Sequence, residues 1–363
     1  MSNDPHAQNK HHHPLEQTSG LSRREALQLT LPVAAAGLLG PGMFPARAGL
    51  AKVGTLMLDR SRRFLKLLNK PQHNKATFAF ASKRRKTWSF MWGSRYAPGL
   101  PLEKMRKEQQ EAALDLLAAA LSSDGMTKAG QIMLQQDILR DEWQKGSPDR
   151  NRERFSLMIF GTPSETGRWG WRFEGHHLSL SFTLKGTDVV SITPSSFSSE
   201  PNTVPSGPHK GLIVLKDEET IGRRLFADLS AKNRKAALLR RASYGNILAT
   251  AGRESRVLKG HRAGVPLADL PQAQVDLILR LMDVYAVDNF AGPLAGEQRK
   301  RLREGDMMST RFGWAGPNTG EKSMYYRLHG DTFLIEFATL RNQPLHHHTI
   351  RHDAERNFGV HRI

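Results

Sequence analysis

Histidines lie at metal-ligand spacing in two distant stretches of the chain. His346 and His348 are separated by one residue, and His176 and His177 follow Gly175. Residues two apart on a strand point to the same side, so His346 and His348 can present two imidazoles to one ion. Adjacent residues face opposite ways, so one of His176 and His177 is expected to join them unless Gly175 reshapes the backbone. Two or three imidazoles with a carboxylate suit zinc, copper or non-haem iron.

The carboxylate that best fits this set is Glu336, which stands between Ile335 and Phe337 on an otherwise apolar strand. A buried glutamate is costly unless it is paired, coordinated or protonated. We therefore predict Glu336 as a ligand or as the catalytic general base. The alternative is an outward-facing residue that pairs with Arg327 or Arg341.

Glu174 and His329 are predicted to support the ligands from a second layer. The chain has no cysteine, which excludes thiol nucleophiles, Cys-ligated zinc, iron-sulfur clusters and disulfides. We find no phosphate loop, dinucleotide fingerprint, nucleophile elbow or His-Glu-x-x-His helix. Histidines in turns and strands also serve as simple hydrogen-bonding groups, and this structural interpretation stays open.

The elements that must position these residues repeat along the chain. Residues 171–182 alternate with the period of a strand, and residues 326–337 repeat their apolar pattern at the same offsets. The change of apolar parity near Gly175 predicts a bulge or bend there. Residues 99–117 are likewise echoed by residues 264–282, each a proline-containing loop followed by an amphipathic helix.

We therefore predict an α+β fold of two related halves, each with helices packed on an antiparallel β-hairpin, related by a pseudo-twofold duplication. The predicted organisation is a signal peptide over 1–48, a first half over 60–200, a connector over 201–222 and a second half over 223–363. Further helices are expected over 102–121, 128–143, 218–249 and 272–287. Ser195 to Pro208, rich in serine and proline, is assigned to the connector.

The first residues resemble an export signal. Ser22-Arg23-Arg24 precedes a moderately apolar run from Leu27 to Leu39, and Ala46-Arg47-Ala48 resembles a cleavage site. This order is typical of a bacterial twin-arginine signal peptide, so we expect a periplasmic or secreted protein. The alternative is a cytosolic amphipathic helix that carries two arginines. No other stretch reaches the ~18 apolar residues that a membrane span needs.

The net charge of +18 predicts attraction to polyanions but names no partner. Export argues against a genomic nucleic-acid partner and leaves anionic polymers or small acidic substrates. The sequence leaves the oligomeric state open.

A family resemblance rests on several of these segments. Residues 160–163, 169–180, 314–316, 325–327 and 333–336 together resemble the domain of unknown function family 3500. The resemblance implies exported bacterial proteins with no assigned reaction. Residues 338–341 depart from it, because a polar run is expected there before the His-x-His of His346 and His348.

The leading hypothesis is an exported metal-dependent enzyme, hydrolytic or oxidative, with a site between the halves. Its ligands would be His346, His348 and His176 or His177, with Glu336 as ligand or base. The alternative is a non-catalytic envelope protein whose basic surface binds anionic polymers.

Overall fold

The computed structural model describes residues 46–91, 98–143, 150–319 and 322–360. The twin-arginine motif and the apolar run that follows it lie outside the described residues. The α-helices of the described part are α2 (Ala46–Leu67), α3 (Lys70–Ala76), α4 (Lys107–Ala120), α5 (Ser123–Ile138), α6 (Lys216–Asp228), α7 (Ala231–Ala237), α8 (Glu254–Leu258), α9 (Gln272–Ala286) and α10 (Gly292–Leu302). None of them is both long and apolar enough to cross a membrane.

The strands form one mixed, mostly antiparallel sheet. They are β1 (Thr77–Phe78), β2 (Leu100–Pro101), β3 (Ser156–Phe160), β4 (Arg168–Gly175), β5 (Leu178–Lys185), β6 (Asp188–Ser191), β7 (Ser195–Phe197), β8 (Leu238–Arg240), β9 (Val265–Pro266), β10 (Arg311–Ala315), β11 (Tyr325–His329), β12 (Phe333–Thr339) and β13 (His347–Asp353). Their order is β1-β3-β4-β5-β7-β13-β12-β11-β10-β8, with β2 on β3, β6 on β5 and β9 on β10. The fold is therefore α+β, as predicted.

The two hairpins predicted from the repeated strand pattern share one register. Trp171 lies opposite Phe182 in the first hairpin, and Tyr326 lies opposite Phe337 in the second. The order of elements from α2 to β5 also recurs from α6 to β12, with β1 and β8 both parallel to their neighbours. At the centre of the sheet β7 pairs with β13, so the two hairpins lie on either side of this pair.

Two local predictions were wrong, and a third is confirmed in one of its two forms. Residues 218–249, expected as one helix, form α6, α7, β8 and a loop, because Ser230 caps a new helix and the chain then joins the sheet. The change of apolar parity at Gly175 comes from a bend, the turn between β4 and β5, and not from a bulge. Ser195–Phe197 is a buried strand at the middle of the sheet, although its composition is that of a connector.

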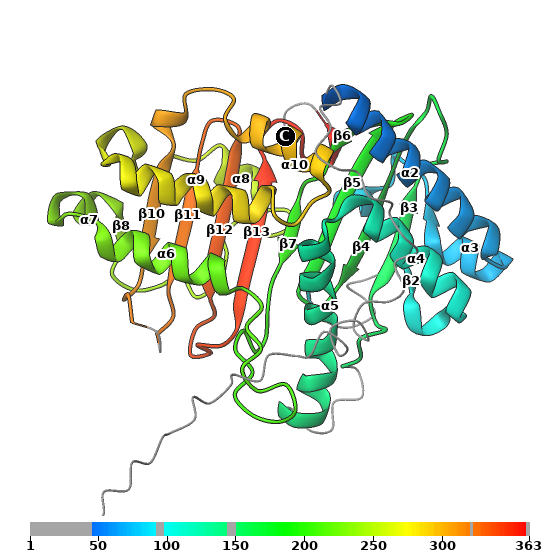
Figure 1. Ribbon diagram of the computed structural model, residues 1–363, viewed down its shortest axis with the longest axis horizontal. Helices are drawn as coiled ribbons and strands as arrows, with labels where there is room; N and C mark the ends of the chain where they lie inside the picture. The colour runs from blue at the N-terminus through cyan, green and yellow to red at the C-terminus, as the bar shows by residue number, and fades with distance from the viewer. Residues whose placement is uncertain (1–45, 92–97, 144–149, 320–321, 361–363) are drawn as a thin grey trace, which may run out of the picture.

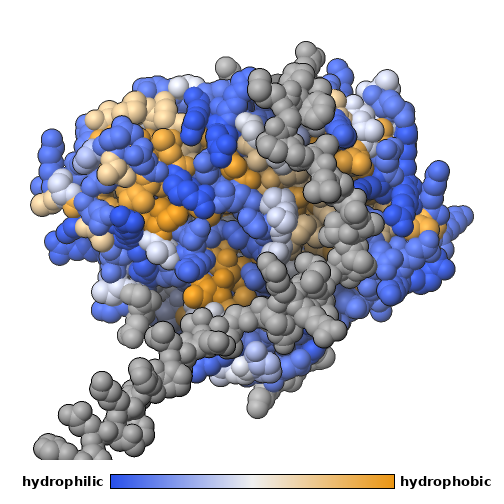
Figure 2. Space-filling view, viewed as in Figure 1, coloured by the Kyte–Doolittle hydropathy of each residue, from blue (hydrophilic) through white to orange (hydrophobic). Residues whose placement is uncertain are grey.

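Helices cover one face of the sheet, the face toward the viewer in Figure 1. Residues Val275, Ile278, Leu281, Met282 and Tyr285 recur at helical intervals along α9 and are buried. Fully burying one such side chain contributes about 1.5–3 kcal/mol, which fixes the helix on the sheet. Figure 2 shows polar and charged side chains over much of this face, with apolar atoms in the furrows between helices.

Loops cover the opposite face of the sheet. Trp88, Phe90 and Ile247 from two loops pack on Ala338 and Ile350, forming a second, smaller apolar cluster. Ala338 of β12 and His348 of β13 are cross-strand partners, so His348 points to this loop-covered face. The fold thus places the histidines where these loops and the central strands meet.

Candidate metal centre

Three histidines from two distant segments of the chain converge at one end of the central strands. His177 lies in the turn between β4 and β5, His346 ends the loop between β12 and β13, and His348 lies near the start of β13. The Nε2 atom of His346 is 2.8 Å from Nε2 of His177 and 3.0 Å from Nε2 of His348. The three ring centres lie 4.7 to 5.2 Å apart. The structure therefore brings three imidazole edges to one place.

The backbone of His177 is clamped in an uncommon conformation. Its φ is 66°, in the left-handed region that non-glycine residues seldom adopt. Its N–H donates to Phe90 O at 2.9 Å, and its C=O accepts from Ser198 N at 2.7 Å. Such strain, of order 1–3 kcal/mol, persists only where the surroundings hold it, and it is often found at functional sites.

The outer nitrogens of His346 and His348 face hydrogen-bond acceptors. Nδ1 of His348 is 2.8 Å from Asn246 Oδ1, an oxygen that also accepts from Ile247 N. Nδ1 of His346 is 2.7 Å from Gln343 Oε1 and 3.1 Å from Glu200 Oε1. We assign the ring proton of each histidine to Nδ1, because amide and carboxylate oxygens can only accept and these contacts therefore need a donor on Nδ1.

This assignment leaves bare lone pairs on the Nε2 atoms of His346 and His348, which face each other at 3.0 Å. Two lone pairs at that distance repel unless a proton or a cation lies between them. His177 can supply a proton to only one of them, through its own Nε2. A metal ion that accepts all three lone pairs resolves the repulsion, and the outer hydrogen bonds match those that orient metal-ligating histidines.

Burial favours the neutral form of His177 and His348. Desolvation lowers the pKa of His177 and of His348 well below the ordinary value, and neighbouring imidazoles lower it further. A neutral imidazole is the form that binds a metal. His346 is the most open of the three, with 12% of its side chain exposed.

His176, also predicted as a ligand, lies beside this group. Its ring stacks on that of His177 with the centres 3.6 Å apart. Nδ1 of His176 is 2.6 Å from Arg150 Nη1 and 2.7 Å from Gln136 Oε1. Desolvation lowers the pKa of His176 well below the ordinary value, and the charge of Arg150 lowers it further. His176 therefore supports His177, whose Nε2 faces His346.

The carboxylate of the site is Glu200. One oxygen lies 3.1 Å from His346 Nδ1, and the other is 3.9 Å from Arg150 Nη2 and has no hydrogen-bond partner in the described part of the chain. Glu200, His176, His177 and His346 each offer a ligand atom, and these four atoms lie within 4.8 Å of one another. Glu200 is 8% exposed, so its charge is held in a largely dry environment.

Glu336 is engaged elsewhere on the same face of the sheet. Its oxygens accept hydrogen bonds from Tyr325 Oη at 2.5 Å, Ala249 N at 2.7 Å and Leu248 N at 3.2 Å. Burial raises its pKa, while these donors oppose the shift. The geometry thus gives the predicted catalytic carboxylate a structural task, which is to hold the loop that also carries Asn246.

The two residues predicted as supporting groups also lie outside the cluster. Glu174 accepts from Ser89 N at 2.8 Å and from Ser179 Oγ at 2.7 Å. His329 ends β11, opposite Arg311 and Leu334, and burial lowers its pKa to about 4. Among the described residues, no contact joins either side chain to the three converging histidines.

Sequence reasoning missed Glu200, Asn246 and Gln343. Asn246 and Gln343 lie in loops without any periodic pattern. Glu200 stands in a serine-rich stretch that we assigned to a connector, yet residues 195–200 are all buried. A glutamate at the end of a stretch of small residues, far from any lysine or arginine in sequence, was the only available signal.

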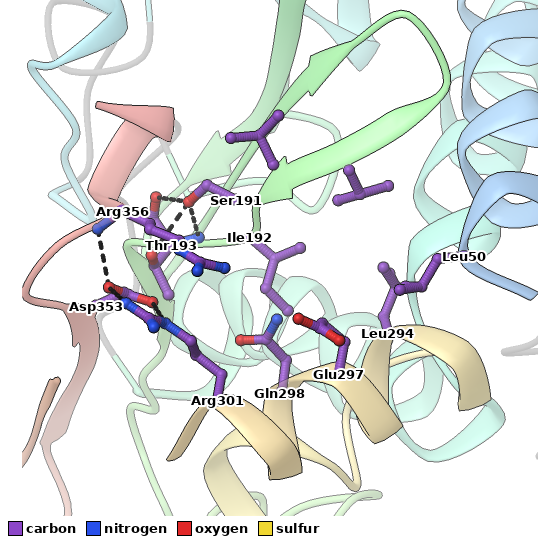
Figure 3. Close-up of a pocket in the computed structure, with 12 residues that line it drawn as sticks. Leu50, Ser191, Ile192, Thr193, Leu294, Glu297, Gln298, Arg301, Asp353 and Arg356 are labelled. Carbon is purple, nitrogen blue, oxygen red and sulfur yellow. Dashed lines mark hydrogen bonds and ion pairs between the residues drawn. The ribbon is translucent and has the colours of Figure 1, made fainter. Parts of the chain in front are cut away.

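A polar hollow lies at the other end of β13, beside α10. Ser191, Thr193, Arg301, Asp353 and Arg356 are among the residues that line it. Figure 3 shows Glu297 and Gln298 reaching into it from α10, toward Arg356 and Ile192. Its buried Arg301 and Asp353 are paired, with Nε of the arginine 2.9 Å from Oδ2. The hollow is separate from the histidine cluster and contains none of its residues.

The fold and site define an α+β protein with a three-histidine cluster enclosed between two β-hairpins. The family model described as protein of unknown function, DUF3500, matches residues 52–360. The chain therefore belongs to this family, as the resemblance indicated. No curated protein and no solved structure matches the chain.

Proposed function

We propose that the protein is an exported metal-dependent enzyme whose metal ion is held by His177, His346 and His348. The observation that carries the proposal is the 3.0 Å approach of Nε2 of His346 and Nε2 of His348, while Nδ1 of each ring faces an oxygen. A cation between these atoms and Nε2 of His177 replaces a repulsion with three coordinate bonds. Asn246 and Gln343 hold the outer nitrogens in the manner that ligating histidines require.

Three imidazoles would hold a divalent metal with one position left for water. Catalytic zinc sites commonly use three protein ligands in this way, and the metal then lowers the pKa of the bound water to about 7. This favours hydrolytic chemistry. Copper or iron held by the same ligands would instead support oxidation, so the metal itself decides between the two.

Glu200 is the residue we propose as proton acceptor, in place of Glu336. One of its oxygens holds the Nδ1 proton of His346, and the other has no hydrogen-bond partner in the described residues. If the three histidines held a metal, this second oxygen would be available to accept a proton from water bound there. The negative charge of Glu200 would raise the pKa of that water.

The Glu200→Gln variant tests this role. In cobalt-substituted protein, we expect the pKa of the bound water, followed by the pH dependence of the visible spectrum, to fall by about one unit. Asp188→Asn removes an exposed carboxylate on the β5–β6 turn and is the matched control. A water pKa unchanged in Glu200→Gln would remove Glu200 from the mechanism.

Metal content tests the proposal as a whole. Protein purified from its own cell envelope should contain close to one equivalent of one transition metal, as measured by elemental mass spectrometry. A chelator should then lower its melting temperature, because a metal bound only to the folded state stabilises it. Protein without metal, whose melting is indifferent to chelator and to added zinc or copper, would end the proposal.

The net charge of +18 supports a second candidate, a non-catalytic envelope protein that binds anionic polymers through its basic surface. Such binding is electrostatic and should weaken steeply as salt rises. Polymer binding in metal-free protein, lost at 0.5 M salt, would favour this candidate; binding unchanged at high salt would count against it.

An internal duplication is also part of the proposal. It is supported by the recurring order of elements and by the equal registers of the two hairpins. In this view the metal centre combines His177 of the first half with His346 and His348 of the second. Relatives of half the length that assemble as dimers would support it, and halves whose β-strands cannot be superposed would oppose it.

A further inference from the structure

Three arginines without acidic partners in the described part of the chain lie on or next to the two loops that carry the partners of the proposed metal ligands. The first loop follows β8 and carries Asn246, the hydrogen-bond partner of His348. The second joins β12 to β13 and carries Gln343, the partner of His346. The exposed arginines are Arg240, which ends β8, and Arg241 and Arg341 on the loops.

Direct contacts join the two loops. Arg341 N donates to Gly245 O at 3.4 Å, next to Asn246 in the chain. The guanidinium of Arg240 lies 5.1 Å from the centre of the Tyr244 ring. Arg240 and Arg341 therefore flank the dipeptide Tyr244-Gly245, within a few residues of the groups that orient the metal ligands.

These arginines are not neutralised locally. Residues 238–253 and 337–352 contain neither aspartate nor glutamate. None of the three arginines forms an ion pair within the described part of the chain, whereas surface arginines such as Arg62, Arg280 and Arg299 do. Unpaired guanidiniums concentrated beside an enzyme site attract anions, and each can hold a carboxylate, sulfate or phosphate group through two hydrogen bonds.

We infer that the substrate of the metal centre carries oxyanion groups, and that Arg240, Arg241 and Arg341 dock it beside the histidines. This inference rests on the proposed function, because it assigns a substrate class to the same site. The shared chemistry is an anionic oxygen group, and carboxylated, sulfated and phosphorylated polymers are its three sources.

The test compares two triple variants that lose the same charge. In the docking variant, Arg240, Arg241 and Arg341 are changed to glutamine. In the control, Lys52, Lys232 and Lys300 are likewise changed to glutamine. These lysines are exposed and form no ion pair with the rest of the described chain. Binding of polygalacturonate, dextran sulfate and polyphosphate, with neutral dextran as blank, is measured by calorimetry at 150 mM salt.

We expect the wild type to bind at least one of the charged polymers, and the docking variant to bind it at least tenfold more weakly. The control should lose less than threefold. The polymer with the highest affinity identifies the source of the oxyanion. Equal losses in the two variants, or no binding of any charged polymer above the dextran blank, would overturn the inference.

Metal content, measured on the same samples, separates this inference from the proposed function. The docking variant should retain the wild-type metal stoichiometry, because the arginines bind no metal. Protein that lacks metal but shows the expected difference between variants would sink the enzyme proposal and leave an anion-binding surface. Metal retained together with equal losses of polymer binding in the two variants would keep the enzyme proposal and overturn the anion-docking inference.

Discussion

The Nε2 atoms of His177 and His346 lie 2.8 Å apart although 169 residues separate them in the chain. One belongs to the turn of the first hairpin and the other to the loop that leads into the last strand. Because β7 and β13 pair at the centre of the sheet, the two hairpins are held at a fixed spacing. The proximity of the two rings is therefore built into the sheet.

Replacing one of the converging histidines should abolish stoichiometric metal binding. His348→Ala removes one of three ligands, and we expect metal affinity to fall by more than a hundredfold, as measured by competition with a coloured chelator. His73→Ala is the control, because His73 is exposed on α3. Equal metal content in His348→Ala and wild type would show that the histidines serve only the fold.

The outer partner of His348 should matter almost as much. Asn246→Ala removes the oxygen 2.8 Å from its Nδ1, and we expect metal affinity to fall by about 10–100-fold. Asn246→Asp keeps an acceptor at the same place and should retain affinity close to that of wild type. If the two variants behave alike, Asn246 does not orient the ring.

Glu336 should affect stability and leave metal binding intact. Glu336→Gln replaces one acceptor oxygen by an NH₂ group that faces the donors Tyr325 Oη, Ala249 N and Leu248 N. We expect a loss of about 1–3 kcal/mol in the free energy of unfolding, measured with urea. A Glu336→Gln variant that is as stable as wild type but has lost its metal would show that Glu336 belongs to the metal site.

Buried histidines outside the candidate metal centre should make the protein sensitive to acid. His352 Nε2 donates to Ala249 O at 2.9 Å, and its Nδ1 accepts from Asn357 Nδ2 at 2.7 Å. Burial lowers its pKa from 6.5 to about 4, with the charge of Arg351 acting in the same direction. In the unfolded chain His352 therefore takes up a proton near pH 6.5, whereas in the folded chain it stays neutral until about pH 4.

Stability is accordingly lost as pH falls through this window, by about 3 kcal/mol for a group shifted this far. His352→Gln should flatten the dependence of the unfolding free energy on pH between 6.5 and 4. His73→Gln, on the surface, should leave the slope unchanged. Equal slopes in both variants and wild type would show that His352 titrates normally.

Export should depend on the paired arginines near the N-terminus. Changing Arg23 and Arg24 to lysine should keep the protein in the cytoplasm, because the twin-arginine route reads this pair. Cell fractionation followed by immunoblotting measures the outcome. Export that persists in the lysine variant, and in a host without the twin-arginine route, would contradict this localisation.

The sequence by itself determined the local elements and the pairs that local geometry controls. Alternating apolar residues predicted both hairpins, and the period of two placed His346 and His348 on one side with His347 on the other. His347 indeed points to the helix-covered face, where its ring centre lies 5.0 Å from that of Phe337. Such pairs follow from strand geometry alone, because neighbouring side chains alternate whatever the rest of the chain does.

Only the tertiary structure decided which carboxylate belongs to the site. The sequence pointed to Glu336 as the site carboxylate because it interrupts an apolar strand, but three donors on the loop-covered face satisfy its oxygens. Glu200 carried no such signal, since its stretch reads as a connector. It reaches His346 because β7 enters the centre of the sheet beside β13, and pairing between strands so far apart in the chain is a long-range choice that local patterns do not encode.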